Sequence, residues 1–106
     1  MTARFGLPQH AVEKICKIFE EYPGIESVLV YGSRARGNYR SNSDIDLSIK
    51  GPDIDLETLF QIENQIDDLL LPWSVDLSLF HKTDNPDLID HISQVGVEFC
   101  ERLRCR

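Results

Sequence analysis

Two aspartates separated by a single residue are the side chains of this chain best suited to metal chemistry. Asp44 and Asp46 alternate with aliphatic residues in the stretch Asp-Ile-Asp-Leu. Because side chains alternate across a β-strand, both carboxylates are expected on one face, with their stems about 6.5–7 Å apart. Two like charges this close favour a bound cation, and magnesium prefers carboxylate oxygen. The spacing therefore predicts a divalent-metal site on a strand.

A glycine–serine pair upstream predicts the phosphate side of the same site. Gly32 and Ser33 end an apolar run, and ten residues lie between Ser33 and Asp44. Glycine lets the backbone approach a phosphate closely, and a serine hydroxyl with nearby N–H groups can hold phosphate oxygens. A helix that begins after Ser33 would add a favourable dipole for an anion.

Three further residues between these motifs are candidates for the phosphate side. Arg34 and Arg36 bring positive charge to it, and Arg36 is the stronger candidate for a phosphate ligand. Ser43 either shapes the turn into the strand or contacts a phosphate. Together with the carboxylates, this arrangement points to phosphoryl or nucleotidyl transfer.

Asp76 is the one acidic residue within an otherwise apolar strand expected over residues 73–80. It either occupies a solvated edge position or lies beside Asp44 and Asp46 on a neighbouring strand. In the second case, three carboxylates can hold two magnesium ions. One ion would activate the attacking oxygen and the other would stabilise the leaving pyrophosphate.

The elements that must position these residues follow from hydrophobic spacing and turn signals. They predict a single domain, residues 1–106, of the mixed α/β (α+β) class. Leu69 to Trp73 are expected to close the core, with an exposed patch for a partner as the alternative. The expected helices span residues 8–22, 33–37, 55–70 and 85–103, and the expected strands span residues 25–31, 44–49 and 73–80.

Composition limits the possible partners and compartments. The chain has 106 residues and a net charge of -7, and its 18 acidic residues outnumber 11 basic ones. Binding to long nucleic acid is therefore disfavoured, because it usually requires a basic face. No apolar run is long enough to cross a membrane and no signal region is evident, so the chain is expected to be cytoplasmic.

The cysteines and histidines give no metal or disulfide pattern. The three cysteines form no Cys-x-x-Cys pair, so reduced thiols are expected, with neither a disulfide framework nor a zinc site. The histidines lack ligand spacing, and no metal or catalytic role is predicted for them: they are His10, His81 and His91.

At its glycine–serine and Asp-x-Asp motifs the chain resembles the minimal nucleotidyltransferase (MNT) family of the DNA polymerase β superfamily. The pattern is Gly32-Ser33, ten residues, Asp44-Ile45-Asp46 and, later, Asp76. This resemblance implies a small mixed β-sheet flanked by helices, two Mg²⁺ ions, and ATP as substrate. It also implies that Asp44 and Asp46 hold both metals, that Asp76 completes the catalytic-metal site, and that Gly32 and Ser33 anchor the triphosphate.

The resemblance also implies a partner. Members of this branch commonly pair with a HEPN-domain toxin and act as type VII antitoxins by transferring AMP to a tyrosine of that toxin. Two alternatives stay open: an antitoxin without catalysis that neutralises its partner by binding, and a nucleotidyltransferase acting on a small molecule such as an aminoglycoside. A homodimer and a hetero-oligomer are both compatible with the sequence.

Overall fold

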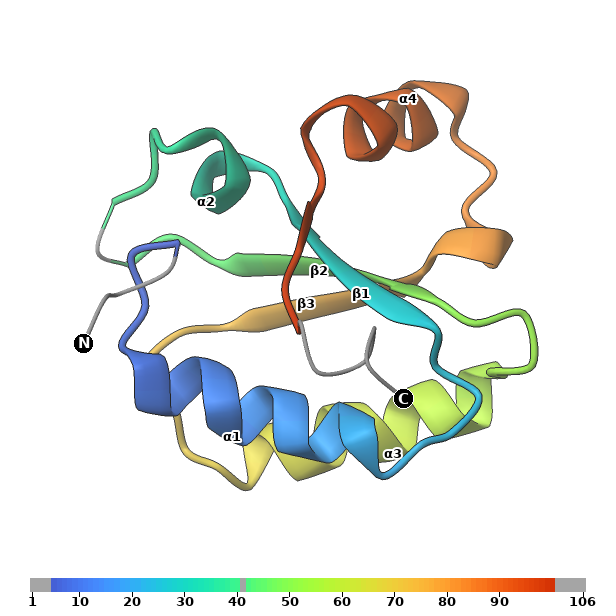
Figure 1. Cartoon of the computed structure of the whole chain (residues 1–106), viewed down its shortest axis with the longest axis horizontal. Coiled ribbons are helices and arrows are strands. Elements are labelled where there is room, and N and C mark those ends of the chain that lie inside the picture. Colours follow the sequence, from blue (N-terminus) through green and yellow to red (C-terminus); the bar gives the residue numbers. More distant parts are fainter. Residues whose placement is uncertain (1–4, 41, 101–106) are drawn as a thin grey trace.

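The computed structural model of the protein describes residues 5–40 and 42–100. Helices and strands alternate along most of the chain (Figure 1). In order they are α1 (Gln9–Glu20), β1 (Ser27–Tyr31), α2 (Ser33–Arg36), β2 (Ile45–Lys50), α3 (Leu56–Asp67), β3 (Val75–Leu79), the 3-10 turn η1 (Phe80–Lys82), α4 (Pro86–Val95) and β4 (Val97–Glu98). Within these described residues, no helix has the length and apolar character needed to cross a bilayer.

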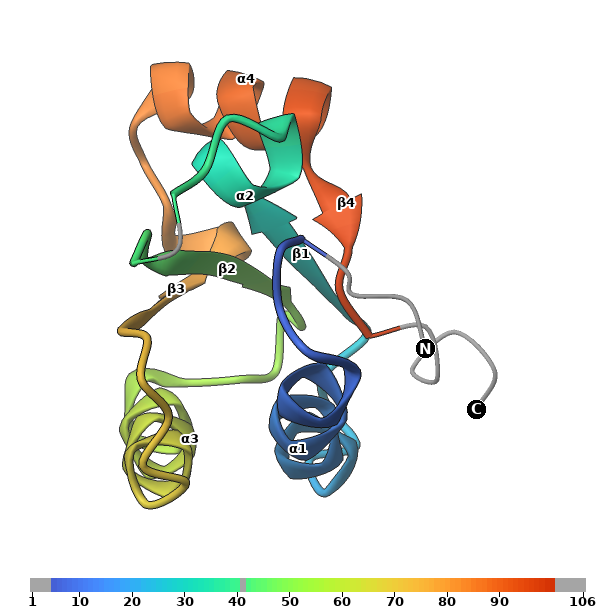
Figure 2. The ribbon, with the colours of Figure 1, turned by 90° about the vertical axis from the view of Figure 1, so that its left-hand side faces the viewer.

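The four strands form one mixed sheet in the order β3-β2-β1-β4. β1 is antiparallel to both β2 and β4, whereas β2 and β3 run parallel. Helices α1 and α3 cover one face of the sheet, and α2 and α4 lie on the other side (Figure 2). The expected small mixed sheet flanked by helices is therefore confirmed.

The core lies between the sheet and the layer formed by α1 and α3. Alternation along β2 sends Ile45, Leu47 and Ile49 into this core, fully buried. The helices contribute apolar stripes at three- and four-residue spacing, among them Ile15 and Phe19 of α1 and Leu59, Ile62 and Ile66 of α3.

The start of α3 shows how local sequence fixes an element that covers the sheet. Asp55, the first residue of the helix expected over residues 55–70, is its N-cap and accepts a hydrogen bond from the Thr58 backbone N–H at 2.8 Å. This bond lowers the pKa of the Asp55 carboxyl below its usual value. The helix ends at Asp67, three residues earlier than expected, and the segment from Leu69 to Trp73 leads to β3. Leu69, Leu71 and Trp73 pack partly buried against the core as expected, but Leu70 is 88% exposed.

The expected final helix over residues 85–103 is wrong in its second half. α4 ends at Val95, and the chain then turns at Gly96 into β4, which pairs with the free edge of β1. The extended pairing continues at Phe99, whose N–H donates to the Val28 carbonyl at 2.8 Å. A sheet edge that offers unpaired backbone groups outweighs the helical spacing of Val95 and Phe99. The last expected helical position, Leu103, lies outside the described residues.

The expected reduced state of all the cysteines is also wrong. Cys16 of α1 and Cys100 form a disulfide across a separation of 84 residues. Both side chains are buried, because β4 brings the chain that follows it down beside α1. Spacing along the sequence carries no information about this pairing, since it depends on an unexpected strand. The third cysteine, Cys105, lies outside the described residues.

Candidate active site

Three strands bring the site together at one end of the sheet. Tyr31, the last residue of β1, pairs with Asp46 of β2, and Asp46 pairs in turn with Asp76 of β3. Asp46 is half-buried and Asp76 is exposed, while Ile45 and Leu77 are buried on the opposite face. The expectation that Asp76 lies beside Asp46 on a neighbouring strand is therefore confirmed.

Asp44 lies at the exposed approach to the same site. It stands one residue before β2, and its charge acts on Asp46. Burial raises the pKa of the Asp46 carboxyl above its usual range, and the charges of Asp76 and Asp44 raise it further. Asp76 and Asp44 therefore both repel the charged form of Asp46, which is the electrostatic condition expected of a cation site.

The carboxylates do not by themselves form a complete set of metal ligands. Across residues 5–40 and 42–100, no three His, Cys, Asp or Glu side chains converge closely enough to hold a metal ion. Asp46 and Asp76 are the pair placed directly opposite each other, with Asp44 to one side. A hard cation here would take its remaining ligands from water or substrate oxygens.

Gly32 connects the end of β1 to the carboxylates. Its φ of 74° and ψ of -151° fall in a region that is almost restricted to glycine. A β-carbon at this position would lie 2.6 Å from Asp46 Oδ2, so the Gly32 backbone is packed against that carboxylate. Ser33 then begins the single turn of α2, as expected, and remains half-buried next to the site. The glycine and serine thus lie beside the acidic residues.

The two arginines of α2 have different surroundings. Arg34 is only 2% exposed and donates to the Ser43 carbonyl from Nε (3.1 Å) and Nη2 (2.8 Å), and to the Phe5 carbonyl from Nη1 (2.9 Å). Burial lowers the pKa of its guanidinium. Its guanidinium carbon also lies 5.3 Å from the centroid of the Tyr39 ring and 5.9 Å from that of the Trp73 ring. Arg34 therefore fixes the loop between α2 and β2.

Arg36 and Ser43 occupy different parts of the loop after α2. Arg36 is exposed, so its predicted contact with a phosphate is sterically open. The Ser43 hydroxyl accepts a hydrogen bond from the Arg40 N–H at 2.8 Å, and the Ser43 N–H donates to the Arg40 carbonyl at 3.1 Å. Ser43 thus shapes the turn into β2, which was one of the two expectations for it.

Two residues that the sequence did not single out lie at the site. The rings of Tyr31 and His91, the latter from α4, meet edge to face with centroids 6.1 Å apart. Burial raises the pKa of the Tyr31 phenol, and a hydrogen bond with the Ser78 side chain opposes that shift. The charge of His91 lowers the pKa of Asp46, so this histidine lies near the carboxylates, and the absence of a metal or catalytic role for it stays a prediction. No spacing pattern in the sequence links α4 to β2.

A comparison with protein families identifies the architecture. The model described as "Polymerase beta, Nucleotidyltransferase" matches residues 13–104. The chain belongs to the polymerase β nucleotidyltransferase family. No curated protein sequence matches this nucleotidyltransferase chain.

Solved structures share the fold of this nucleotidyltransferase at low sequence identity. A chain of a toxin–antitoxin complex with AMP-PNP superposes with a TM-score of 0.69 at 20% identity, covering 89% of this chain and 81% of that one. A chain of the toxin–antitoxin MntA–HepT gives a TM-score of 0.66 at 19% identity, covering 92% of this chain and 81% of that one. A chain of the complex between the tri-AMPylated Shewanella oneidensis HEPN toxin and MNT antitoxin gives a TM-score of 0.64 at 19% identity, covering 86% of this chain and 70% of that one.

Proposed function

We propose that this nucleotidyltransferase transfers AMP from ATP, with magnesium, to a hydroxyl of a HEPN-domain partner and thereby acts as an antitoxin. The observation that carries the proposal is the placement of Asp46 opposite Asp76, with the Gly32 backbone packed on the Asp46 carboxylate. Membership of the nucleotidyltransferase family supplies the reaction class.

The donor set fits magnesium. Asp46, Asp76 and Asp44 provide carboxylate oxygen only, and their mutual repulsion is relieved by a divalent cation. Magnesium usually keeps several waters and binds through one or two carboxylates together with substrate phosphates, so an incomplete protein ligand set suits it. When bound, magnesium would neutralise charge on the triphosphate and lower the pKa of a coordinated hydroxyl.

The protein groups then have distinct tasks in the transfer. The acceptor oxygen attacks the α-phosphorus of ATP, a new P–O bond forms, and the bond to pyrophosphate breaks. Asp76, the more exposed carboxylate of the opposed pair, is the group that we assign to the hydroxyl proton. Gly32, Ser33 and Arg36 are assigned to the triphosphate, and they lie beside the carboxylates at the end of β1 and in α2.

The partner is proposed from what similar structures contain. Chains of the same fold occur in toxin–antitoxin complexes, one with AMP-PNP and one with a tri-AMPylated HEPN toxin. We therefore assign a HEPN-domain protein as the acceptor, and the resemblance to the MNT family adds a tyrosine as the modified residue.

Transfer of labelled AMP tests the proposal directly. The chain is mixed with a purified HEPN-domain protein, MgCl₂ and ATP labelled at the α-phosphate, and the label should appear on the partner. The Asp44→Ala, Asp46→Ala double variant should lose the label. A matched double variant, Glu13→Ala in α1 with Glu21→Ala just after it, removes two exposed carboxylates away from the site and should keep the label.

Calorimetry separates catalysis from neutralisation by binding alone. The wild-type chain should bind ATP with a heat that depends on magnesium, and the Asp44/Asp46 double variant should not. If the chain binds the partner tightly but transfers no label, and if ATP binding gives no magnesium-dependent heat, the catalytically silent antitoxin would be supported instead. Labelling that survives the double substitution would remove the assigned carboxylates from the mechanism.

A further inference from the structure

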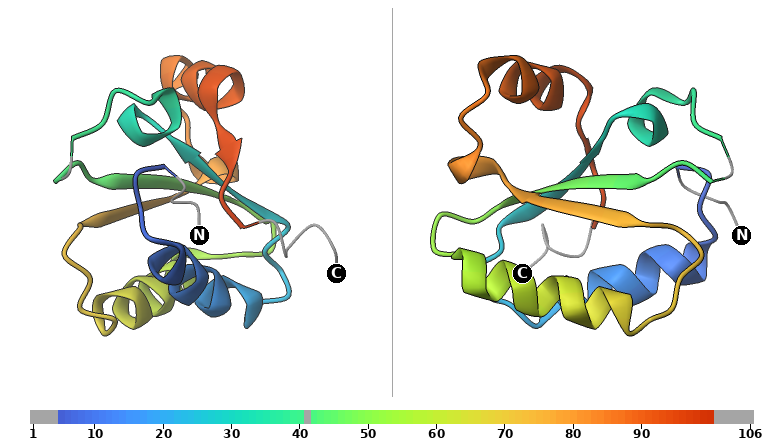
Figure 3. Two further views of the ribbon diagram at one scale, coloured as in Figure 1. Left: turned by 60° about the vertical axis from the view of Figure 1, so that its left-hand side comes forward. Right: turned by 180° about the vertical axis from the view of Figure 1, so that it is seen from behind.

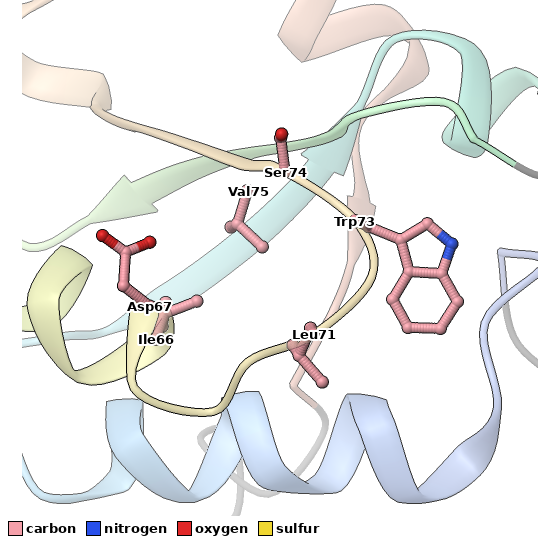
Figure 4. A pocket seen from close by; sticks show the side chains of 6 residues that line it. All are labelled: Ile66, Asp67, Leu71, Trp73, Ser74 and Val75. Atoms are coloured by element: carbon pink, nitrogen blue, oxygen red, sulfur yellow. The ribbon is translucent and has the colours of Figure 1, made fainter.

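The segment that joins α3 to β3 borders a cavity on the side of the sheet away from the carboxylates. The cavity has a volume of about 410 Å³ and is lined by Ile66, Asp67, Leu71, Trp73, Ser74 and Val75. In Figure 4 the connecting segment curves around these side chains, with Ile66 and Asp67 on one side and Trp73 on the other. Beside it, Leu70 is 88% exposed and holds a positive φ of 54°, a conformation that is unfavourable for leucine. The proposed reaction uses none of these residues.

An exposed flank of α3 continues from this cavity. Leu56, Phe60 and Asp67 follow one another at four- and seven-residue spacing and share one side of the helix. Leu56 is 51% exposed and Phe60 is 59% exposed, so two large apolar side chains stand one helical turn apart on the same flank and form an apolar patch.

The orientation of α3 shows which way this flank faces. Gln65, on the opposite flank, accepts a hydrogen bond from the Tyr22 hydroxyl at 2.9 Å, and Tyr22 follows α1. The flank that carries Leu56 and Phe60 therefore faces away from α1. Because α3 lies beneath the β3 side of the sheet, that flank lies along the outer edge, below β3 (Figure 2 and Figure 3, right).

The charge around this surface is mostly acidic, although the charge of Lys82 reaches Asp55, next to Leu56. Between Lys50 and Lys82 the sequence contains no lysine or arginine. The same stretch contains the acidic residues Asp53, Asp55, Glu57, Glu63, Asp67, Asp68 and Asp76. An acidic surface repels nucleic acid and anionic membranes and attracts a basic protein surface.

We propose that a basic amphipathic segment of the protein that receives AMP binds one surface of this chain. This surface, the α3–β3 surface, consists of Leu56, Phe60, Asp67 and the adjoining cavity. An apolar anchor of that segment would enter the cavity, and its lysine or arginine residues would face Asp67 and the neighbouring carboxylates. The position suits the proposed function, on which this inference rests. Val75 lines the cavity, and the next residue, Asp76, faces the site on the other side of the same edge strand. A partner held at this edge is therefore within reach of the carboxylates.

Affinity for the HEPN-domain protein used in the labelling assay tests the α3–β3 surface. Phe60→Ser and Asp67→Lys are expected to weaken binding about tenfold or more, as measured by calorimetry with the complete chain. Two controls match them: Val97→Ser replaces an apolar side chain that is 41% exposed on the opposite edge of the sheet, and Glu21→Lys reverses an exposed charge after α1. Both controls should bind within about twofold of wild type. Raising the salt concentration should weaken wild-type binding more than it weakens binding by Asp67→Lys.

The outcomes separate this inference from the proposed function. Equal binding by Phe60→Ser, Asp67→Lys and both controls would overturn the docking surface, even if label transfer occurs. Weakened binding by these two variants, with no label transfer from any form, would keep the surface and overturn the enzyme. At saturating partner concentration both variants should transfer AMP at the wild-type rate, because neither residue lies at the carboxylates. No binding by the wild-type chain would overturn the docking surface as well.

Discussion

Gly32 packs directly against the carboxylate of Asp46, because a β-carbon at Gly32 would lie 2.6 Å from Asp46 Oδ2. The positive φ of Gly32, 74°, is a second reason why a residue other than glycine is unfavourable at this position. Gly32→Ala should therefore lower the free energy of unfolding by about 1–3 kcal/mol from backbone strain and displace the Asp46 side chain. Binding of ATP with magnesium should be lost, which calorimetry and urea denaturation can measure together.

Gly37→Ala is the matched control for that substitution. Gly37 also has a positive φ, of 86°, but no neighbouring atom lies within 4 Å of a β-carbon placed there. The control should lose about 1–2 kcal/mol of stability through the same backbone effect and still bind the nucleotide. Similar nucleotide affinities for the two variants would contradict the assigned contact between Gly32 and Asp46.

Asp46→Asn should stabilise the metal-free chain. Burial and the charges of Asp76 and Asp44 raise the Asp46 pKa, so the fold favours its protonated form. The protonated Asp46 carboxyl contributes fully to the free energy of unfolding below the unfolded-state pKa, which is near 4. This contribution is lost as pH rises through the folded-state pKa. At pH 7 the neutral variant should therefore melt a few degrees higher than wild type. Thermal melts between pH 4 and 8 with EDTA measure the effect, and wild type should approach the variant at the acidic end.

Added magnesium and ATP should reverse the order of these two proteins. Ligand that binds only the folded state raises the melting temperature, and Asp46→Asn is expected to lose that increase. A metal-free variant that melts below wild type at pH 7 would mean that Asp46 is held by a favourable interaction instead of by repulsion.

Arg34→Lys should destabilise the fold although it keeps the charge. A lysine cannot reproduce the forked contacts of Arg34 with the Ser43 and Phe5 carbonyls. Loss of hydrogen bonds from a buried charged group is expected to cost about 2 kcal/mol in urea denaturation. The same substitution two residues later, Arg36→Lys, changes an exposed side chain and should leave the unfolding free energy unchanged. Equal stability of both variants would exclude the loop-fixing role of Arg34.

Thiol counting checks the bond between Cys16 and Cys100. The chain has three cysteines, so denatured but unreduced protein should react with a thiol reagent at one site, Cys105. Reduction should make all three thiols reactive. It should also lower the free energy of unfolding by about 2–4 kcal/mol, because the bond spans 84 residues. Cys105→Ser serves as the control and should leave no reactive thiol before reduction. Three reactive thiols in the unreduced wild type would contradict the disulfide.

Local sequence determined much of the scaffold. Alternation at Asp44-Ile45-Asp46 fixed which face carries the carboxylates, and Asp55 marked the start of α3. These features depend on side-chain periodicity and on hydrogen bonds between near neighbours in the chain, which the order of residues alone specifies. For the same reason the glycine–serine and Asp-x-Asp motifs were sufficient to indicate the family.

Contacts between distant segments were decided only by the tertiary structure. Strand order brought Asp76 opposite Asp46, and the pairing of β4 with β1 replaced an expected helix and brought Cys100 to Cys16. The placement of His91 against Tyr31 likewise depends on how α4 lies over the sheet. Secondary-structure propensity and hydrophobic spacing describe one segment at a time. These contacts depend instead on the sheet edges and helix faces that remain available once the core has packed.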